Sequence, residues 1–579
     1  MRPLDEHTPA ILVPHLGAGG TTAVIAVVPS GPLTAELVGP ETTHHLVPGK
    51  IEKVPGWTGG PYSRIPLPQS LAPGTYFVRA RTGDLELTSE PFVIAPERLQ
   101  RQTMSDVLAY FKAMRSSGEI DRKDRTARRW DDDSGTTVDA RGGWLDASGD
   151  TSKFLSHLTY TSTMSPQQIP LCAWAMLAAR DELSPALTKI LGARLRDEAL
   201  WGADFLVRFR SPDGYFYTGI FDALTKQLDE RVITAPLQDC VRTSRYQAAY
   251  RQGGGLAIAA LARAATVDDD GDFPRTTYLT AAREAFEHLE KQNLAYLFDG
   301  KESIIDDYCA LLAATELTAA LAAAEQSHDM STEAARRRAT SLISRYEKPT
   351  DNGSGTSRAD QPSDNHSGYF RADDLGRPFF HAAEPGLPIL ALLRFAELLP
   401  DAPEAGAARR TAIDAMHAIL DRTASVPNPF GYPRTLNQPT GCLPREAFFF
   451  PHANETGYWW QGENAAIASL AAAAHACAKH PEARTADLHT FAADQLAWIT
   501  GRNPFDTSML HGRGRNNADY TSDFPNLPGG ILNGITAGWT DEADIAFLPD
   551  AAPEGDSWRW AEQWIPHTGW FLLAVASAC

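Results

Sequence analysis

Two aspartates that lie four residues apart in a glycine-rich stretch are well placed to do chemistry. Asp146 and Asp150 belong to the segment GGWLDASGDTSKF, which begins at Gly142. Two carboxyl groups crowded into one tight turn raise each other's pKa, which a purely structural turn seldom requires. Hydrolysis of a glycosidic bond with inversion needs a carboxylate that activates water and a carboxylic acid on the opposite side of the bond. The aspartate pair could hold that water between its two carboxyl groups.

Aromatic residues on long loops form a second group with a chemical use. Long loops in a compact domain are usually functional or disordered, and the aromatic content of these loops argues against disorder. The loops span residues 116–165, 211–245, 348–385, 426–461 and 501–563. Flat rings held over a rigid scaffold suit stacking on sugars, although any single ring could serve only to pack its loop. The candidate platforms are Trp144, Tyr215, Tyr217, Tyr369, Tyr458, Trp459, Trp460, Trp539, Trp558 and Trp560.

Two loop segments place a histidine and a glutamate directly before an expected helix. They are RPFFHAAEPG, with His381 and Glu384, and PHANETGYWWQGEN, with His452, Glu455, Tyr458, Trp459 and Glu463. These groups could hydrogen-bond sugar hydroxyls while Tyr458 and Trp459 stack on a ring. The alternative is that Glu384 and Glu463 cap helix N-termini and that the other residues pack their loops.

We expect no cofactor and no metal. His452 and Glu455 have the spacing of two metal ligands, but no third ligand is evident. The runs Asp131-Asp132-Asp133 and Asp268-Asp269-Asp270 offer oxygen ligands for structural calcium, and charged surface turns explain them more simply. The cysteines contain no CxxC pair, which argues against a zinc site and against a disulfide framework. They are Cys172, Cys240, Cys309, Cys442, Cys477 and Cys579, of which Cys309 and Cys477 are expected to be buried.

The elements that must position these groups fall into two regions. Residues 1–97 contain short β-prone runs such as AVIAVVPS and GTYFVRAR, separated by Gly/Pro turns. This pattern is typical of a small β-sandwich. The segment Pro96-Glu97-Arg98 marks the boundary, so residues 98–579 are predicted to form a second, catalytic domain.

The second region has the texture of Ala-rich helices. Apolar residues recur at helical spacing in about twelve segments that fall into six pairs. The expected helices begin near Thr103, Ser165, Ala186, Tyr246, Tyr278, Asp307, Ser331, Gly386, Ala407, Gly462, Thr485 and Trp564. Segments such as GGGLAIAALARAA and GENAAIASLAAAAHA place small residues beside Leu, which permits close helix–helix approach. Such a mainly α chain with long, irregular connections predicts an (α/α)6 toroid, because an α-solenoid would need repeats of regular length.

Composition and charge exclude several classes of protein. Hydrophobic residues make up 43% and charged residues 22% of the 579 residues, which is the balance of a folded globular protein. The formal net charge of -19 has the wrong sign for a generic nucleic-acid binder. An acidic cleft suits neutral or cationic ligands, and solubility alone explains the charge equally well.

No run of residues approaches the ~20 apolar residues of a membrane helix. The N-terminal segment MRPLDEHTPA lacks the apolar core of a secretory signal. We therefore expect a cytoplasmic protein, or a secreted or periplasmic one if a signal peptide precedes the numbered chain. The expected partner is an oligosaccharide or polysaccharide, with neither nucleic acid nor membrane, and the expected state is a monomer or homodimer.

The segment GGWLDASGD is similar to the GGW-x-DAGD motif of glycoside hydrolase family 9, in the branch that carries an N-terminal immunoglobulin-like domain. Other segments resemble the family in the same order along the chain. These are WGADFL before SPDGYFY, DDYCALLAATEL, GRNP with Ser508 and the GRG at 512–514, and the PGG at 528–530. The resemblance covers nearly the whole chain past residue 100. It implies an (α/α)6 barrel with glycosidase activity in polysaccharide degradation.

The resemblance also assigns roles to individual residues. The last Asp of the family motif is the base and the first positions the water, which implies Asp150 and Asp146. This chain has one extra residue between them, Ser148 or Gly149, so either Asp could be the base.

The general acid of the family is a Glu just before the last barrel helix, and the matching residue here is Glu562. Trp558 matches an aromatic residue of the family pattern. Flanking by Trp560 and Trp564 would desolvate Glu562, raise its pKa and keep it protonated. The alternatives are that Glu562 only caps the last helix, or that Glu554 is the acid.

The chain departs from the family where substrate subsites are expected. The family often has a His-His-Arg stretch, but this chain reads RNNADY at 515–520, and HTG stands at 567–569. We therefore expect rebuilt subsites in an inverting hydrolase of β-linked glucan or gluco-oligosaccharide, with exo action left open and glucosamine as a cationic option.

Two alternatives remain. A polysaccharide lyase could use Tyr458 and His452, but the net charge opposes a polyanionic substrate. A non-catalytic glycan-binding protein would not be expected to keep both acidic regions.

Overall fold

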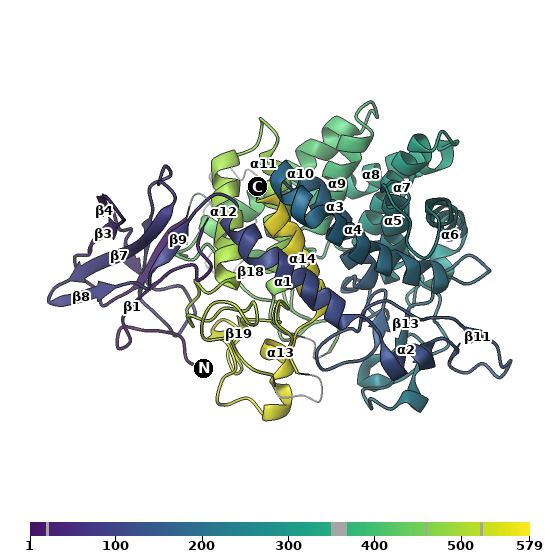
Figure 1. Ribbon diagram of the computed structural model, residues 1–579, viewed down its shortest axis with the longest axis horizontal. Helices are drawn as coiled ribbons and strands as arrows, with labels where there is room; N and C mark the ends of the chain where they lie inside the picture. Colours follow the sequence, from purple (N-terminus) through teal and green to yellow (C-terminus); the bar gives the residue numbers. More distant parts are fainter. Residues whose placement is uncertain (19–21, 349–367, 458–459, 521–524, 579) are drawn as a thin grey trace.

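The structure is a computed structural model that describes residues 1–18, 22–348, 368–457, 460–520 and 525–578 (Figure 1). It contains a β-sandwich at the N-terminus and a larger helical domain beside it. The predictions of Tyr458 and Trp459 as substrate-binding residues lie outside the described residues. In the described part of the chain, no helix combines the length and apolar character needed to cross a membrane.

The N-terminal domain is built from two antiparallel sheets. One sheet has the order β1 (Ala10–Leu12), β2 (Ala23–Val27), β6 (Tyr62–Pro66) and β5 (Ile51–Glu52). The other has the order β4 (Thr43–Leu46), β3 (Thr34–Val38), β7 (Gly74–Thr82) and β8 (Leu85–Thr88), with β9 (Phe92–Ile94) also paired to β7. Side chains of both sheets, such as Val24 and Val78, meet in one hydrophobic core. The predicted β-sandwich is confirmed.

Strand β2 explains how the sandwich docks on the helical domain. All five of its residues are buried, which is unusual for a strand of a two-layer sandwich. Successive side chains of a strand point to opposite faces. Val24 and Ala26 therefore lie in the sandwich core, whereas Ile25 and Val27 belong to the core of the helical domain.

In the described part of the chain, the helical domain is a closed ring of six inner helices with six outer helices around it. Consecutive inner helices contact each other, and the last contacts the first. The inner helices are α3 (Ile169–Glu182), α5 (Gly254–Ala264), α7 (Ile304–Ala323), α9 (Leu387–Leu398), α11 (Asn464–Ala478) and α14 (Ile565–Ser577). The outer helices are α1 (Arg98–Met114), α4 (Pro185–Arg208), α6 (Arg275–Tyr296), α8 (Asp329–Ser344), α10 (Ala405–Ala424) and α12 (Thr485–Ile499). This arrangement confirms the predicted mainly α fold class, an (α/α)6 toroid.

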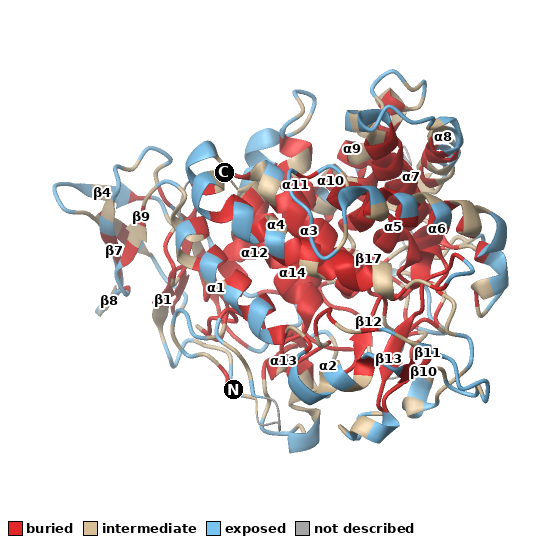
Figure 2. Ribbon diagram, turned by 45° about the vertical axis from the view of Figure 1, so that its right-hand side comes forward, coloured by how far each residue is buried: buried red, intermediate tan, exposed pale blue. Residues whose placement is uncertain are grey.

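The sequences of the inner helices explain their place. A helix that is apolar on all sides must be buried, and α5 and α11 are buried over nearly their whole length (Figure 2). Small residues let the helices approach closely. A Cβ atom added to Gly255 of α5 would lie 2.8 Å from the Cβ atom of Cys309 in α7.

Each long loop enters an inner helix at its N-terminus, whereas the connections that follow inner helices are short. The loops carry two short helices, α2 (Gly118–Asp124) and α13 (Trp558–Ala561), and Figure 1 shows both on the same side of the ring. They also carry the 3-10 turns Leu228–Glu230, Gln238–Cys240, Tyr250–Gln252 and Glu554–Asp556. A three-stranded sheet of β12 (Lys153–Phe154), β13 (Gly219–Phe221) and β14 (Val232–Ile233) joins the first two loops. The remaining short strands pair as β10 (Ala127–Arg128) with β11 (Thr137–Val138), β15 (Tyr346–Glu347) with β16 (Tyr369–Phe370), β17 (Thr435–Asn437) with β18 (Arg445–Ala447), and β19 (Thr536–Ala537) with β20 (Ile545–Ala546).

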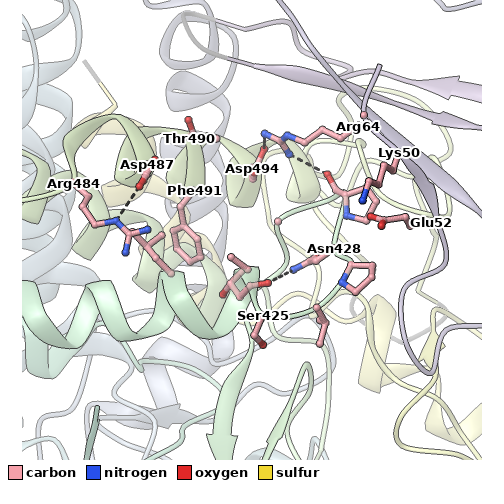
Figure 3. A pocket seen from close by; sticks show the side chains of 18 residues that line it. Lys50, Glu52, Arg64, Ser425, Asn428, Arg484, Asp487, Thr490, Phe491 and Asp494 are labelled. Carbon is pink, nitrogen blue, oxygen red and sulfur yellow. Dashed lines mark hydrogen bonds and ion pairs between the residues drawn. The ribbon is translucent and has the colours of Figure 1, made fainter. Parts of the chain in front are cut away.

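Buried charges tie the sandwich to the toroid. The guanidinium of Arg502, which is buried, donates to the carbonyl of Ala23 at 2.7 Å and to Asp494 at 2.6 Å. Arg64 of β6 donates to the same carboxylate at 3.0 Å. A groove of about 720 Å³ lies beside this contact, and Figure 3 shows Arg64 near Asp494 at one side of it. Arg484 and Asp487 form an exposed pair elsewhere in the groove.

The contact predicts a strong effect of one substitution. Asp494→Asn leaves the buried Arg502 without its anionic partner, so the free energy of unfolding should fall by about 3 kcal/mol. Urea unfolding measures this change. The matched control on the same helix is Asp487→Asn, whose exposed pair should contribute no more than about 0.5 kcal/mol. Equal effects of the two substitutions would contradict this view of the interface.

Candidate active site

A cavity of about 500 Å³ lies where the long loops meet at the N-terminal ends of the inner helices. Its polar and aromatic lining residues are Asp146, Asp150, His157, Tyr160, Lys226, Gln238, Gln461, Tyr520, Trp558, Glu562 and Trp564. Its apolar lining residues include Leu158, Phe221, Leu224, Pro236 and Leu237. The cavity thus combines three carboxyl groups with aromatic rings and an apolar wall.

The turn that carries the two aspartates is joined to the segment before the last inner helix. The turn is closed by reciprocal hydrogen bonds between Ala147 and Asp150, each 3.2 Å long. Ser148 N–H donates to the Gln563 carbonyl at 2.9 Å, and Ile565 N–H donates to the Asp146 carbonyl at 3.1 Å. These bonds bring residues more than 400 positions apart in the sequence onto one wall of the cavity.

Glu562 lies directly against the tip of the turn. The N–H of Gly149 donates to its Oε1 atom at 3.1 Å. Burial, followed by repulsion from Asp150, raises the pKa of Glu562 to about 8. Glu562 is only partly buried, and it lines the cavity. It is therefore a carboxylic acid at neutral pH and can deliver its proton to a bound molecule.

The two aspartates have different surroundings. Asp146 is 3% exposed and accepts a hydrogen bond of 2.9 Å from the indole N–H of Trp564. Burial and the neighbouring Asp150 hold its pKa well above the usual range. Asp150 is 8% exposed and accepts the N–H of Ser152 at 2.8 Å. Burial raises the pKa of Asp150 to about 6, so this carboxyl is mostly ionised at neutral pH.

A buried ionic cluster supports the far side of the turn. Asp124 accepts a hydrogen bond from the guanidinium of Arg231 and forms an ion pair of 2.7 Å with the ammonium of Lys153. Arg231 also donates to the carbonyl of Thr151 at 2.8 Å. Since Asp124 precedes the turn and Arg231 belongs to the next long loop, this cluster fixes both loops beside Asp150.

The prediction that Trp144 and Trp560 bind substrate disagrees with their burial, since both rings lie in the core. The indole of Trp144 donates to Glu198 at 2.9 Å. It also fills the space over Gly202, where an added Cβ atom would lie 2.5 Å from the ring. Trp558, in contrast, lines the cavity, and its role in substrate binding stays a prediction.

In the first His/Glu segment, RPFFHAAEPG, both His381 and Glu384 are buried. Glu384 accepts hydrogen bonds from the Gln167 N–H and the Tyr308 hydroxyl, at 2.9 and 2.7 Å, and burial raises its pKa to about 8. The side chain of His381 accepts the N–H groups of Ala383 and Glu384. Neither residue lines the cavity. The predicted sugar contacts of His381 and Glu384 therefore disagree with their positions.

The second His/Glu segment also packs against its neighbours. Glu455 accepts hydrogen bonds from Ser162 and Thr163 of the first long loop. The ring of His452 stacks on Trp460 with centroids 4.1 Å apart. His452 and Glu455 are not among the residues that line this cavity, and their predicted sugar contacts stay predictions.

Several residues that line the cavity were not predicted from the sequence. His157 lies in the same loop as the aspartates, stacks on Phe154 and places its Nδ1 atom 3.9 Å from Asp146. Lys226 and Gln238 come from the second long loop and belong to no recognisable motif, whereas Gln461 lies in the segment PHANETGYWWQGEN but was not itself predicted. Among the described residues, no group of three or more His, Cys, Asp or Glu side chains is arranged to hold a metal ion.

Comparisons with known proteins agree with this architecture. The sequence model described as "Glycosyl hydrolase family 9" matches residues 101–523, which include both aspartates. A metagenome-derived glycoside hydrolase family 9 endoglucanase is 16% identical, with a TM-score of 0.63 over 99% of both chains. The family 9 endoglucanase J30 is also 16% identical, with a TM-score of 0.60 over 98% of both chains. A Zn-binding triple mutant of J30 is 15% identical, with a TM-score of 0.60 over 96% of this chain and 98% of that one. A search among curated proteins gave no match.

The raised pKa of Glu562 predicts a pH-dependent difference in stability between wild type and Glu562→Gln. The unfolded state releases this proton near pH 4.5, whereas the folded state keeps it until about pH 8. The wild type should therefore lose stability relative to the variant as pH rises through this window. Urea unfolding at a series of pH values measures the difference. A difference that stays constant from pH 4 to 9 would contradict the assignment of a protonated Glu562.

Proposed function

We propose that this chain, which belongs to glycosyl hydrolase family 9, hydrolyses a β-linked glucan or gluco-oligosaccharide with inversion. The chain is a glycoside hydrolase. The observation that carries the finer proposal is the position of Glu562, which lines the same cavity as Asp146 and Asp150 and touches their turn. An acid that is protonated at neutral pH beside an ionised carboxylate is the pair that this reaction needs.

In the proposed mechanism, Asp150 is the base. A base must be ionised when substrate binds, and Asp150 meets this condition near neutral pH because its pKa is about 6. Asp146 is more deeply buried, and its pKa is held higher. Its hydrogen bond from Trp564 fixes the carboxyl so that it can orient the attacking water. This assignment also agrees with the resemblance of Asp150 to the last Asp of the family motif.

In the proposed reaction, Asp150 and Glu562 account for both proton transfers. Asp150 takes a proton from the water as its oxygen attacks the anomeric carbon. Glu562 gives its proton to the leaving oxygen as the glycosidic bond breaks. Glu562 is left ionised and Asp150 protonated, and exchange with solvent restores both states before the next turnover.

The cavity supports a neutral sugar substrate. Trp558, Tyr520 and Tyr160 offer aromatic surface to the faces of sugar rings. The two endoglucanases with similar folds suggest glucan as the polymer. A volume of about 500 Å³ lies within the usual range of small-molecule pockets and can hold a short oligosaccharide or the end of a chain. The sizes of the first products from a cello-oligosaccharide ladder test exo against endo action.

The roles of the two acidic sites predict the effect of two substitutions. Glu562→Gln and Asp150→Asn should each lower the rate of cello-oligosaccharide cleavage by about 10²-fold or more, because each removes a proton-transfer group. Product release measured by chromatography tests this. Glu554→Gln is the control, since Glu554 is exposed and does not line the cavity. Activity that survives Glu562→Gln but not Glu554→Gln would reassign the acid.

The pKa values predict the pH dependence of kcat/KM. The rate should rise as Asp150 ionises, near pH 6, and fall as Glu562 loses its proton, near pH 8. The result is a bell-shaped profile with its maximum between these values. Initial rates on one soluble oligosaccharide from pH 4 to 10 give the profile. A maximum below pH 5 would contradict the assigned protonation states.

A further inference from the structure

The aspartate turn is one residue longer than the family motif that it resembles, and the extra residue is Ser148 or Gly149. We propose that these two residues are positioning residues for the general acid, and that they hold Glu562 in the orientation in which it protonates the leaving oxygen. This inference rests on the proposed function.

Gly149 acts on the carboxyl group itself. Its N–H donates to Oε1 of Glu562 at 3.1 Å. The carbonyl oxygen of a carboxylic acid is the better acceptor, so this bond favours the form in which Oε2 carries the acidic proton. The backbone N–H of Asn533 donates to the backbone carbonyl of Glu562 at 2.7 Å, which fixes the backbone that carries this carboxyl group. The rotation of the carboxyl group is therefore restricted before substrate binds.

Gly149 also has no room for a side chain. An added Cβ atom would lie 2.4 Å from Oε1 of Glu562 and 2.8 Å from the hydroxyl of Tyr520. Both neighbours would have to move. The close approach of backbone to carboxyl thus requires glycine at this position.

Ser148 acts on the backbone on both sides of Glu562. Its Oγ atom accepts the N–H of Gln563 at 2.9 Å and donates to Oδ1 of Asn526 at 2.8 Å. The side-chain amide of Asn526 in turn donates to the carbonyl of Ala561 at 2.8 Å. Ala561 and Gln563 are the direct neighbours of Glu562, so the Ser148 hydroxyl fixes one directly and the other through Asn526.

Because these groups are buried, loss of one of the hydrogen bonds should displace Glu562. Ser148 is 2% exposed and Gln563 is fully buried. Loss of the Ser148 hydroxyl leaves the N–H of Gln563 without this partner in a site where water does not readily replace it. Small displacements of a reacting group lower rates steeply, by about 10²-fold for 1 Å.

A comparison of leaving groups separates positioning of the acid from general damage to the site. A 2,4-dinitrophenolate leaves without protonation, whereas an unsubstituted phenol needs the proton of Glu562. The experiment measures kcat on 2,4-dinitrophenyl and phenyl β-cellobioside for wild type, Ser148→Ala, Gly149→Ala and Asn526→Ala. Glu562→Gln serves as the reference for complete loss of the acid, and thermal unfolding checks that each variant is folded.

We expect Ser148→Ala and Asn526→Ala to lose about 10-fold or more on the phenyl glycoside and less than about 3-fold on the dinitrophenyl glycoside. Gly149→Ala should show the same pattern with a larger loss. Equal losses on both substrates, or no loss on either, would overturn the positioning role while leaving the hydrolase proposal intact. If the wild type cleaves neither glycoside and no cello-oligosaccharide, the proposed function fails and the inference fails with it.

Discussion

The pairing of residues 146–150 with residues 562–565 is the contact on which the site depends. It joins the first long loop to the segment that enters the last inner helix, through hydrogen bonds from Ser148 to Gln563 and from Ile565 to Asp146. The pairing is available only because α14 lies beside α3, which closes the ring of inner helices. Closure of the toroid and assembly of the three carboxyl groups are therefore one structural event.

The same contact brings together the three carboxyl groups whose difference in pKa the proposed mechanism requires. Three carboxyl groups in one cavity cannot all ionise, since burial and mutual repulsion penalise each added charge. Glu562 and Asp146 hold their protons more tightly than Asp150. The hydrogen bond from the N–H of Ser152 and the nearby guanidinium of Arg231 both favour the ionised form of Asp150. The buried pairing of Arg231 with Asp124 keeps that guanidinium in place without exposing it to substrate. The proposed acid, Glu562, and the proposed base, Asp150, thus differ in pKa because their surroundings differ.

Helices and the paired aspartates were predictable because their signals are local. The start of α12 at Thr485 was predicted at the residue itself, and that of α4 within one residue, since apolar periodicity and turn residues mark them. The roles of His381 and Glu384 were not predictable, because their burial arises from contacts with Gln167 and Tyr308 that are distant in sequence. The burial of Trp144 was not predictable for the same reason, because its position beside the aspartate turn does not reveal which way the ring packs. Lys226 and Gln238 reach the cavity through loop conformations that no short motif encodes.

In the proposed mechanism, Asp150 and Glu562 act on opposite sides of the glycosidic bond with a water molecule between base and sugar. The most direct test is the configuration of the first product released from a β-linked oligosaccharide, followed by proton NMR before mutarotation. We expect the α-anomer, because a single displacement by water inverts the anomeric carbon. Initial release of the β-anomer would mean a covalent intermediate, and would contradict the roles given to both residues.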